Sequence, residues 1–200
     1  MMAMKFKFLG IEIYVSFLFA AILVIMLATD RTGLLLPSLF AIFVHEAAHL
    51  FAMWIVDCTP KKIRLIPASI QIIRRFGLSE KNEIFVALLG PIANLILFIV
   101  LYINYLSFHN VMTLYYSIIN LLVGTFNLLP VIGLDGGTVL LEILSKKGDY
   151  TRAVRILKTV TFIICAITLA IAIILLLKGK FNISAFILAI YFFIMGILKM

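Results

Sequence analysis

The sequence predicts an all-α polytopic membrane protein with six transmembrane helices and a small β-sheet near the cytoplasmic face. Of its 200 residues, 64% are hydrophobic and 13% are charged, whereas a soluble domain is about half apolar and a quarter charged. The mean hydropathy is +1.22. Long apolar runs alternate with short basic loops. These values exclude a water-soluble globule, a disordered chain and a low-complexity protein.

Six apolar runs are long enough, or nearly so, to cross a bilayer, which takes about 20 mostly apolar residues. The first has a possible lead-in at residues 10–14, and we interpret it as a retained span because no convincing signal-peptide cleavage site follows it. The predicted spans are residues 15–28, 34–56, 84–106, 111–129, 154–177 and 183–198.

The basic residues predict the orientation of these spans. With six spans, both termini lie on one side, and most of the 17 Lys and Arg residues fall on that side. Only Arg31, Lys178 and Lys180 fall on the other. Cytoplasmic loops are enriched in Lys and Arg, so we expect cytoplasmic N- and C-termini. The formal net charge of +8 is explained by this bias, and we expect no nucleic-acid partner.

Two segments have the composition of strands instead of helices. Residues 10–15 are rich in β-branched and aromatic residues, and residues 63–73 are similar but contain Pro67. A proline within such a run suits a turn or an edge position. The sequence therefore predicts a small sheet from these two segments.

The second predicted span contains three ionisable residues, His45, Glu46 and His49. A charge inside the membrane is costly, which makes it a functional candidate. Residues four apart lie on one face of a helix, so both imidazoles can reach one metal ion with Glu46 beside it as a general base. The alternative is a pair of buried histidines that are satisfied without a metal.

A catalytic zinc site needs three protein ligands and an open position for water. Asp30, Asp57 and Asp149 fall at span ends or in loops, where a solvated charge is expected. Asp135 lies between apolar stretches, 11 residues before Lys146, just as His45 lies 11 residues before Val56. Equal depth makes Asp135 the third candidate ligand, if its stretch is helical. The alternative is that Asp135 caps a helix ahead of Gly136.

Three motifs in this order resemble the site-2 protease family of intramembrane zinc metalloproteases. They are HEAAH at residues 45–49, GPIAN at residues 90–94 and NLLPVIGLDGG at residues 127–137. The six spans and strand-like N-terminus resemble its compact branch, which includes a sporulation protease that processes a pro-sigma factor. We expect one membrane-embedded domain over residues 1–200, with a catalytic core at about 34–145 and without the CBS or PDZ domains of other members.

The resemblance implies that one Zn²⁺ per chain is bound by His45, His49 and Asp135, with Glu46 as the catalytic glutamate. It implies a membrane-tethered protein substrate, such as an anti-sigma factor, a pro-sigma factor or another transcription regulator. It also allows regulatory membrane partners, and it places the chain in a bacterial or archaeal cell membrane. The oligomeric state is left open.

Asn94 is the candidate for contact with the substrate or oxyanion, with a helix–helix hydrogen bond as the equal alternative. Asn127 has the same ambiguity, and we favour the structural role there. Because a helical substrate must unwind before cleavage, we hypothesise that it pairs with a strand edge in residues 10–15 or 63–73.

Two other classes of protein fit part of the pattern. An ion or proton transporter could use the buried His, Glu and Asp residues, but no repeated halves are visible and the residues cluster at metal spacing. A non-catalytic membrane scaffold would not need all four chemical positions, His45, Glu46, His49 and Asp135, to be filled. The substitution Glu46→Gln separates these classes: it should abolish the activity of a protease while leaving its metal bound, and it should matter little to a scaffold.

Overall fold

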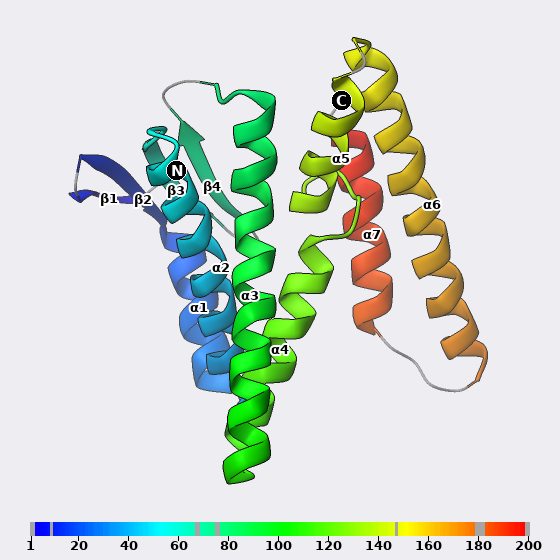
Figure 1. The fold of residues 1–200 in the computed structure, drawn as a ribbon. Helices are drawn as coiled ribbons and strands as arrows, with labels where there is room; N and C mark the ends of the chain where they lie inside the picture. The colour runs from blue at the N-terminus through cyan, green and yellow to red at the C-terminus, as the bar shows by residue number, and fades with distance from the viewer. Residues whose placement is uncertain are drawn as a thin grey trace.

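The computed structural model describes residues 3–8, 10–66, 69–74, 77–146, 148–178 and 183–198 (Figure 1). A four-stranded sheet lies beside the first helices, and the later helices extend away from it. The elements, in chain order, are β1 (Ala3–Phe8), β2 (Ile11–Ser16), α1 (Phe17–Thr29), α2 (Leu35–Ile55), β3 (Pro60–Ile66), β4 (Ser69–Arg74), α3 (Glu80–Phe108), α4 (Val111–Asn127), α5 (Asp135–Ser145), α6 (Tyr150–Leu177) and α7 (Ile183–Leu198).

The predicted sheet is confirmed but has four strands in the order β1-β2-β3-β4. β1 and β2 pair antiparallel, β2 and β3 pair parallel, and β3 and β4 pair antiparallel. Pro67 lies outside the described residues. The prediction of a mainly helical chain did not include β1, although Lys5, Phe6 and Lys7 already show the period-two alternation of a strand.

The sheet topology corrects one part of the strand-edge hypothesis. β2, which covers most of predicted residues 10–15, lies between β1 and β3. Both of its edges are therefore hydrogen-bonded to neighbours, and it offers no free edge to a substrate. Among the described strands, the outer ones are β1 and β4.

Each predicted span corresponds to a helix of the structure. Three helices are both long and apolar enough to cross a membrane: α2, α3 and α6. α1 and α4 are shorter apolar helices, and α7 has 16 residues. The chain is therefore an integral membrane protein by the length and composition of these helices, while the count of six spans stays a prediction.

The outer faces of the helices are apolar, as expected where lipid surrounds them. Phe43 is 71% exposed, Trp54 is 66% exposed and Leu177 is 81% exposed. Inside the bundle, Val131 and Leu134 pack with Cys165 and Phe192 of α6 and α7. This cluster holds the non-helical segment between α4 and α5 inside the protein, where irregular backbone is tolerated at membrane depth because lipid does not reach it.

Candidate metal centre

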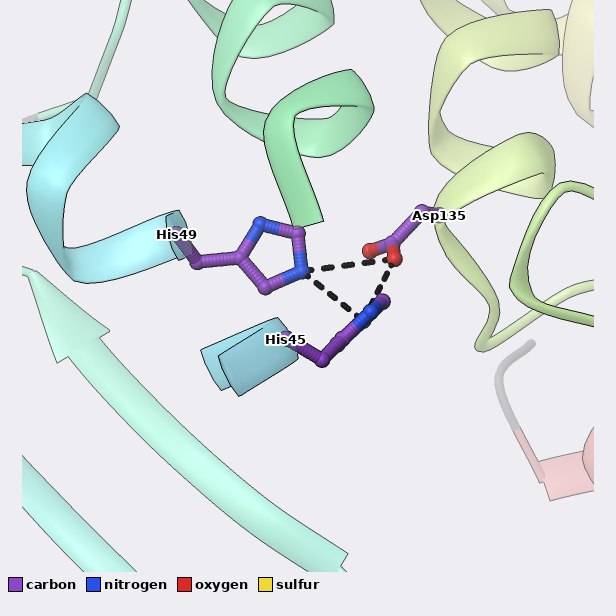
Figure 2. A group of neighbouring side chains, drawn as sticks. All are labelled: His45, His49 and Asp135. Atoms are coloured by element: carbon purple, nitrogen blue, oxygen red, sulfur yellow. Dashed lines mark hydrogen bonds and ion pairs between the residues drawn. The ribbon is translucent and has the colours of Figure 1, made fainter. Parts of the chain in front are cut away.

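α2 presents two histidines on one face, as predicted. His45 and His49 are one helical turn apart, and they are only 6% and 8% exposed. Their ring centroids lie 4.6 Å apart, and their Nε2 atoms are 3.1 Å apart. Figure 2 shows both rings directed toward Asp135.

Asp135 is the first residue of α5, and Leu134 is the N-cap. The alternative in which Asp135 caps this helix is therefore wrong. The assumption that the following stretch is helical is confirmed, since α5 runs over 11 residues. Asp135 reaches the two histidines from a different element, so the three residues meet only through the tertiary fold (Figure 2).

Two glycines let α5 begin at this place. A Cβ on Gly136 would lie 2.1 Å from the carbonyl oxygen of Leu128, and one on Gly137 would lie 2.0 Å from that of Val131. Backbone atoms cannot move aside as a side chain can, so any other residue would push the helix start away from the preceding segment. The DGG motif is therefore explained by close approach of backbone to backbone.

A threonine of α6 fixes the segment before Asp135. Thr161 is fully buried, and its hydroxyl accepts a hydrogen bond from the amide of Ile132 at 3.1 Å. The same hydroxyl donates to the carbonyl of Leu157 at 2.9 Å. Sequence analysis did not single out Thr161; a hydroxyl within an apolar span was the available signal.

The three side chains have the spacing of ligands around one ion. His45 Nε2 and His49 Nε2 lie 3.0 Å and 3.3 Å from Asp135 Oδ2, and 3.1 Å from each other. In a tetrahedral site with bonds of about 2.0–2.1 Å, neighbouring ligand atoms are about 3.3 Å apart. The triangle therefore matches one face of such a tetrahedron, with the fourth position left to water or substrate.

The hydrogen bonds behind the rings decide which atoms face the centre. His45 Nδ1–H donates to Asn94 Oδ1 at 2.8 Å, and His49 Nδ1–H donates to the carbonyl of Val86 at 2.8 Å. In the neutral imidazoles, each Nε2 then carries a lone pair. Asp135 Oδ2 is buried and receives no hydrogen bond within the described part of the chain. Three lone pairs thus converge, and a cation among them would satisfy all three.

The close approach of the histidines to α3 depends on Gly90. A Cβ on this residue would lie 2.4 Å from His49 Nε2 and 2.9 Å from His45 Cε1. The first residue of the GPIAN motif is therefore the point at which the helix backbone passes beside the candidate ligands. The sequence showed the glycine but gave no indication of which residues approach it.

Asn94 is fully buried, and its amide is committed to structure. Besides accepting from His45, it donates to the carbonyl of Ala41 at 2.9 Å and to Asn120 Oδ1 at 2.8 Å. These contacts do not fit the expectation that Asn94 meets the substrate; they fit the helix–helix alternative. Asn120, also fully buried, donates onward to the carbonyl of Tyr116 at 2.8 Å, and sequence reasoning missed it.

Glu46 lies between two hollows of different character. A cavity of about 220 Å³ beside the candidate ligands is lined by Glu46, Asn127 and Ile72, among others. A second hollow of about 660 Å³ between α1, α2 and the sheet is almost wholly apolar, and Glu46 and Ile72 also line it. Glu46 therefore lies where the apolar groove meets the candidate metal centre, directly after His45 and three residues before His49 in the chain.

The other aspartates behave as predicted for loop residues. Asp30 Oδ1 accepts from the amide and hydroxyl of Thr32, and these bonds hold the pKa of Asp30 below its usual range. Asp149 accepts from the amide of Arg152 at the start of α6. Asp57 follows α2 with a φ of 52°. The structure brings none of these three to His45 and His49.

Comparison with known proteins agrees with this geometry. Residues 105–171 match the sequence model of peptidase family M50; this segment contains Asp135 but not the HEAAH motif. A zinc metalloprotease of Methanocaldococcus jannaschii is 27% identical over 203 residues, which cover 94% of this chain and 57% of that protein. The chain thus spans little more than half the length of this curated relative.

The fold also has a solved counterpart. The structure of a site-2 protease from Methanocaldococcus jannaschii superposes with a TM-score of 0.70 at 23% identity, over 98% of this chain and 94% of that one. The likeness extends over the sheet and helices together, beyond the segment matched by the family model. This chain is therefore similar to peptidase family M50 over part of its sequence, to a zinc metalloprotease over most of its length, and to a site-2 protease in its fold.

Proposed function

We propose that this chain is an intramembrane zinc metalloprotease that hydrolyses a peptide bond in or near a transmembrane segment of a membrane-tethered protein. One observation carries the proposal: two imidazole nitrogens and a buried carboxylate oxygen form a triangle of 3.0–3.3 Å beside a cavity lined by Glu46. His45, His49 and Asp135 would hold Zn²⁺ through these atoms. When bound, zinc would acidify a water molecule and polarise the scissile carbonyl.

Glu46 is the proposed general base. Its carboxylate lines the same cavity as the ligands, so it can take a proton from water there and pass it to the leaving amine. Asn127 also lines this cavity, and its Nδ2 donates to the carbonyl of Val123 at 3.0 Å. Its Oδ1 is therefore the amide oxygen we assign to contact with the substrate backbone, in place of Asn94.

Asn94 is assigned a positioning role. By accepting from His45 Nδ1–H, it keeps the lone pair of that ring on Nε2 and holds the ring plane. Partners of this kind raise ligand basicity, and their loss commonly costs about 10–100-fold in metal affinity.

The apolar groove is the proposed entry for the substrate. It contains Ile63 and Leu65 of β3, Ile72 of β4 and apolar residues of α1 and α2, a surface that suits a transmembrane segment leaving the lipid. β4 is an outer strand, and Ile72 lines both the groove and the catalytic cavity. An unwound substrate that pairs with the outer edge of β4 would be led directly to Glu46.

We further propose that α1, α2, α3, α4, α6 and α7 are the six spans, with α5 inside the protein between them. The start of β1 and the end of α7 lie toward the same end of the molecule in Figure 1, which supports an even number of crossings. The basic residues of the sheet and of the first turns of α6 favour the cytoplasm for this end.

The first test is zinc content by elemental analysis of detergent-purified chain. We expect about one zinc per wild-type chain, much less in Asp135→Ala, and an unchanged amount in Glu46→Gln, which keeps all three ligands. Asp149→Ala is the matched control, because it removes a carboxylate outside the centre. A well-folded wild type that takes up no zinc when zinc is supplied would contradict the proposal.

The second test is proteolysis. Wild type and Glu46→Gln are co-expressed with a panel of single-span membrane-tethered reporters, including pro-sigma and anti-sigma factors, and cleavage is followed by immunoblotting. Cleavage by the wild type and none by the variant is the expected result. Equal processing by both proteins would separate this chain from a protease and favour a transporter or scaffold.

A further inference from the structure

The N-terminal sheet has one strongly cationic face. Residues opposite one another on neighbouring strands share a face. The register aligns Lys5 with Tyr14 and Tyr14 with Arg64. The adjacent row aligns Lys7 with Glu12, and Glu12 with Lys62. We call the residues Lys5, Lys7, Glu12, Tyr14, Lys62 and Arg64 the cationic sheet face.

One carboxylate on this face compensates one of the cations. Glu12 Oε2 accepts from Lys62 Nζ at 2.9 Å and from the hydroxyl of Tyr14 at 3.0 Å. These hydrogen bonds, Lys62 first, hold the pKa of Glu12 below its ordinary value, so Glu12 is ionised at neutral pH. Within the described part of the chain, Lys5, Lys7 and Arg64 form no ion pair with a carboxylate.

Three cations of this face, Lys62 included, gather around the ring of Tyr14. Lys5 Nζ and Lys62 Nζ each lie 5.4 Å from the centroid of the Tyr14 ring, and Arg64 Cζ lies 5.9 Å from it. Cation–π attraction supports each contact, but like charges this close repel one another. Beside them, a hollow of about 560 Å³ is lined by Lys7, Lys61 and Arg74 together with Glu12. An anionic ligand would relieve the repulsion.

The opposite face of the same sheet is apolar and only partly covered. Ile63, Leu65 and Ile72 face the groove beside α1 and α2. Met4 and Phe6 of β1, on the same side, are 47% and 52% exposed. In Figure 1 the β1–β2 hairpin extends away from the helices. A hairpin that exposes apolar groups on one side and cations on the other is suited to a membrane–water interface, where each side meets the environment that it prefers.

The position in the chain agrees with such a location. β2 ends at Ser16 and α1 begins at Phe17, so the sheet is attached directly to the end of an apolar helix. Basic clusters at this depth attract the anionic headgroups of the cytoplasmic leaflet.

We propose that the cationic sheet face binds the phosphate groups of anionic phospholipids in the adjacent leaflet, while Met4 and Phe6 contact the acyl region. The sheet would then be held at the interface by lipid, independently of whether the metal centre is loaded. A zwitterionic lipid, whose phosphate is neutralised by its own amine, would not be selected.

The experiment measures binding of a fluorescent phosphatidylglycerol to the full chain in detergent, with fluorescent phosphatidylcholine as reference. The test variant is Lys5→Gln/Lys7→Gln/Arg64→Gln. The matched control is Arg152→Gln/Arg155→Gln/Lys158→Gln on α6, which lowers the net charge equally at the same end of the molecule. Zinc content is measured on every protein as an independent check that the bundle has folded.

Each interfacial Lys or Arg changes anionic-lipid binding by roughly fivefold, so the test variant should raise the Kd for phosphatidylglycerol about tenfold or more. The control should stay within about threefold of wild type, binding of phosphatidylcholine should be equal in all proteins, and the effect should shrink as salt rises. Unchanged binding by the test variant, or an equal loss in the control, would overturn the proposal. So would tighter binding of an acidic peptide than of phosphatidylglycerol, since the face would then serve a protein.

Discussion

Replacement of Gly90 by alanine should weaken zinc binding strongly without unfolding the protein. The new Cβ would lie 2.4 Å from His49 Nε2, and ordinary contact begins at 3.4 Å. The imidazole must therefore move by about 1 Å, whereas metal–ligand bonds tolerate only about 0.2 Å. The atoms in conflict are the far end of a side chain, so the ring can turn aside and the helices can keep their packing.

The expected loss of zinc affinity follows from the displacement of the His49 imidazole. Losing a partner behind a ligand costs about 10–100-fold in metal affinity, and moving a ligand itself should reach the upper end of this range. A 100-fold loss corresponds to about 2.7 kcal/mol. The thermal stability of the metal-free protein should change little, because alanine also favours a helix over glycine by about 1 kcal/mol.

The assay is zinc competition against a chromophoric chelator on purified Gly90→Ala, with melting temperatures recorded for the metal-free proteins. Gly196→Ala on α7 is the matched control: its Cβ would lie 3.1 Å from Phe162 Cζ, a tight contact with no candidate ligand. Wild-type zinc affinity in Gly90→Ala would refute the placement of this glycine against the ligands. An equal loss of zinc affinity in Gly196→Ala would show that a tight glycine substitution weakens zinc binding wherever it lies in the bundle.

Three further outcomes follow from the same structure. Asn120→Leu leaves Asn94 Nδ2 short of one acceptor and should weaken zinc binding about tenfold. Asn120→Asp keeps an acceptor oxygen and should bind zinc with nearly the wild-type affinity. Equal zinc affinities in the two variants would contradict a role for the Asn120 amide. Gly136→Ala should lower both the melting temperature and the zinc content, because its Cβ meets the backbone of Leu128 and not a movable side chain; a stable, zinc-loaded variant would contradict that contact. The pKa of Glu12 is lowered in the folded protein, so the ionised carboxylate stabilises the fold above its ordinary pKa, and this stabilisation is lost as the pH falls through the lower folded-state pKa. The melting temperature of wild type should therefore exceed that of Glu12→Gln at neutral pH, and the difference should vanish in acid. A difference that persists in acid would refute this prediction.

The sequence alone determined the membrane class, the helices and the identity of the candidate ligands. Hydropathy can be determined from neighbouring residues alone, which is why each predicted span coincides with a helix of the structure. His45 and His49 share a helix, and a four-residue spacing places them on one face whatever surrounds that helix. Asp135 could be chosen because few carboxylates occur between apolar stretches, where a charge needs a partner.

Only the tertiary structure decided how these pieces work together. Sheet order is set by pairing between distant segments, which is why β2 was mistaken for an exposed edge and β1 was missed. The role of Asn94 depends on whether its amide lines a cavity or contacts Nδ1 of His45. An asparagine within an apolar stretch of sequence could do either. The closeness of Gly90 to two imidazoles, and of Gly136 to Leu128, comes from the packing of helices far apart in the chain. The sequence shows only that a glycine occurs at each of these positions. It does not show why, because the atoms that exclude a larger side chain belong to other helices and segments.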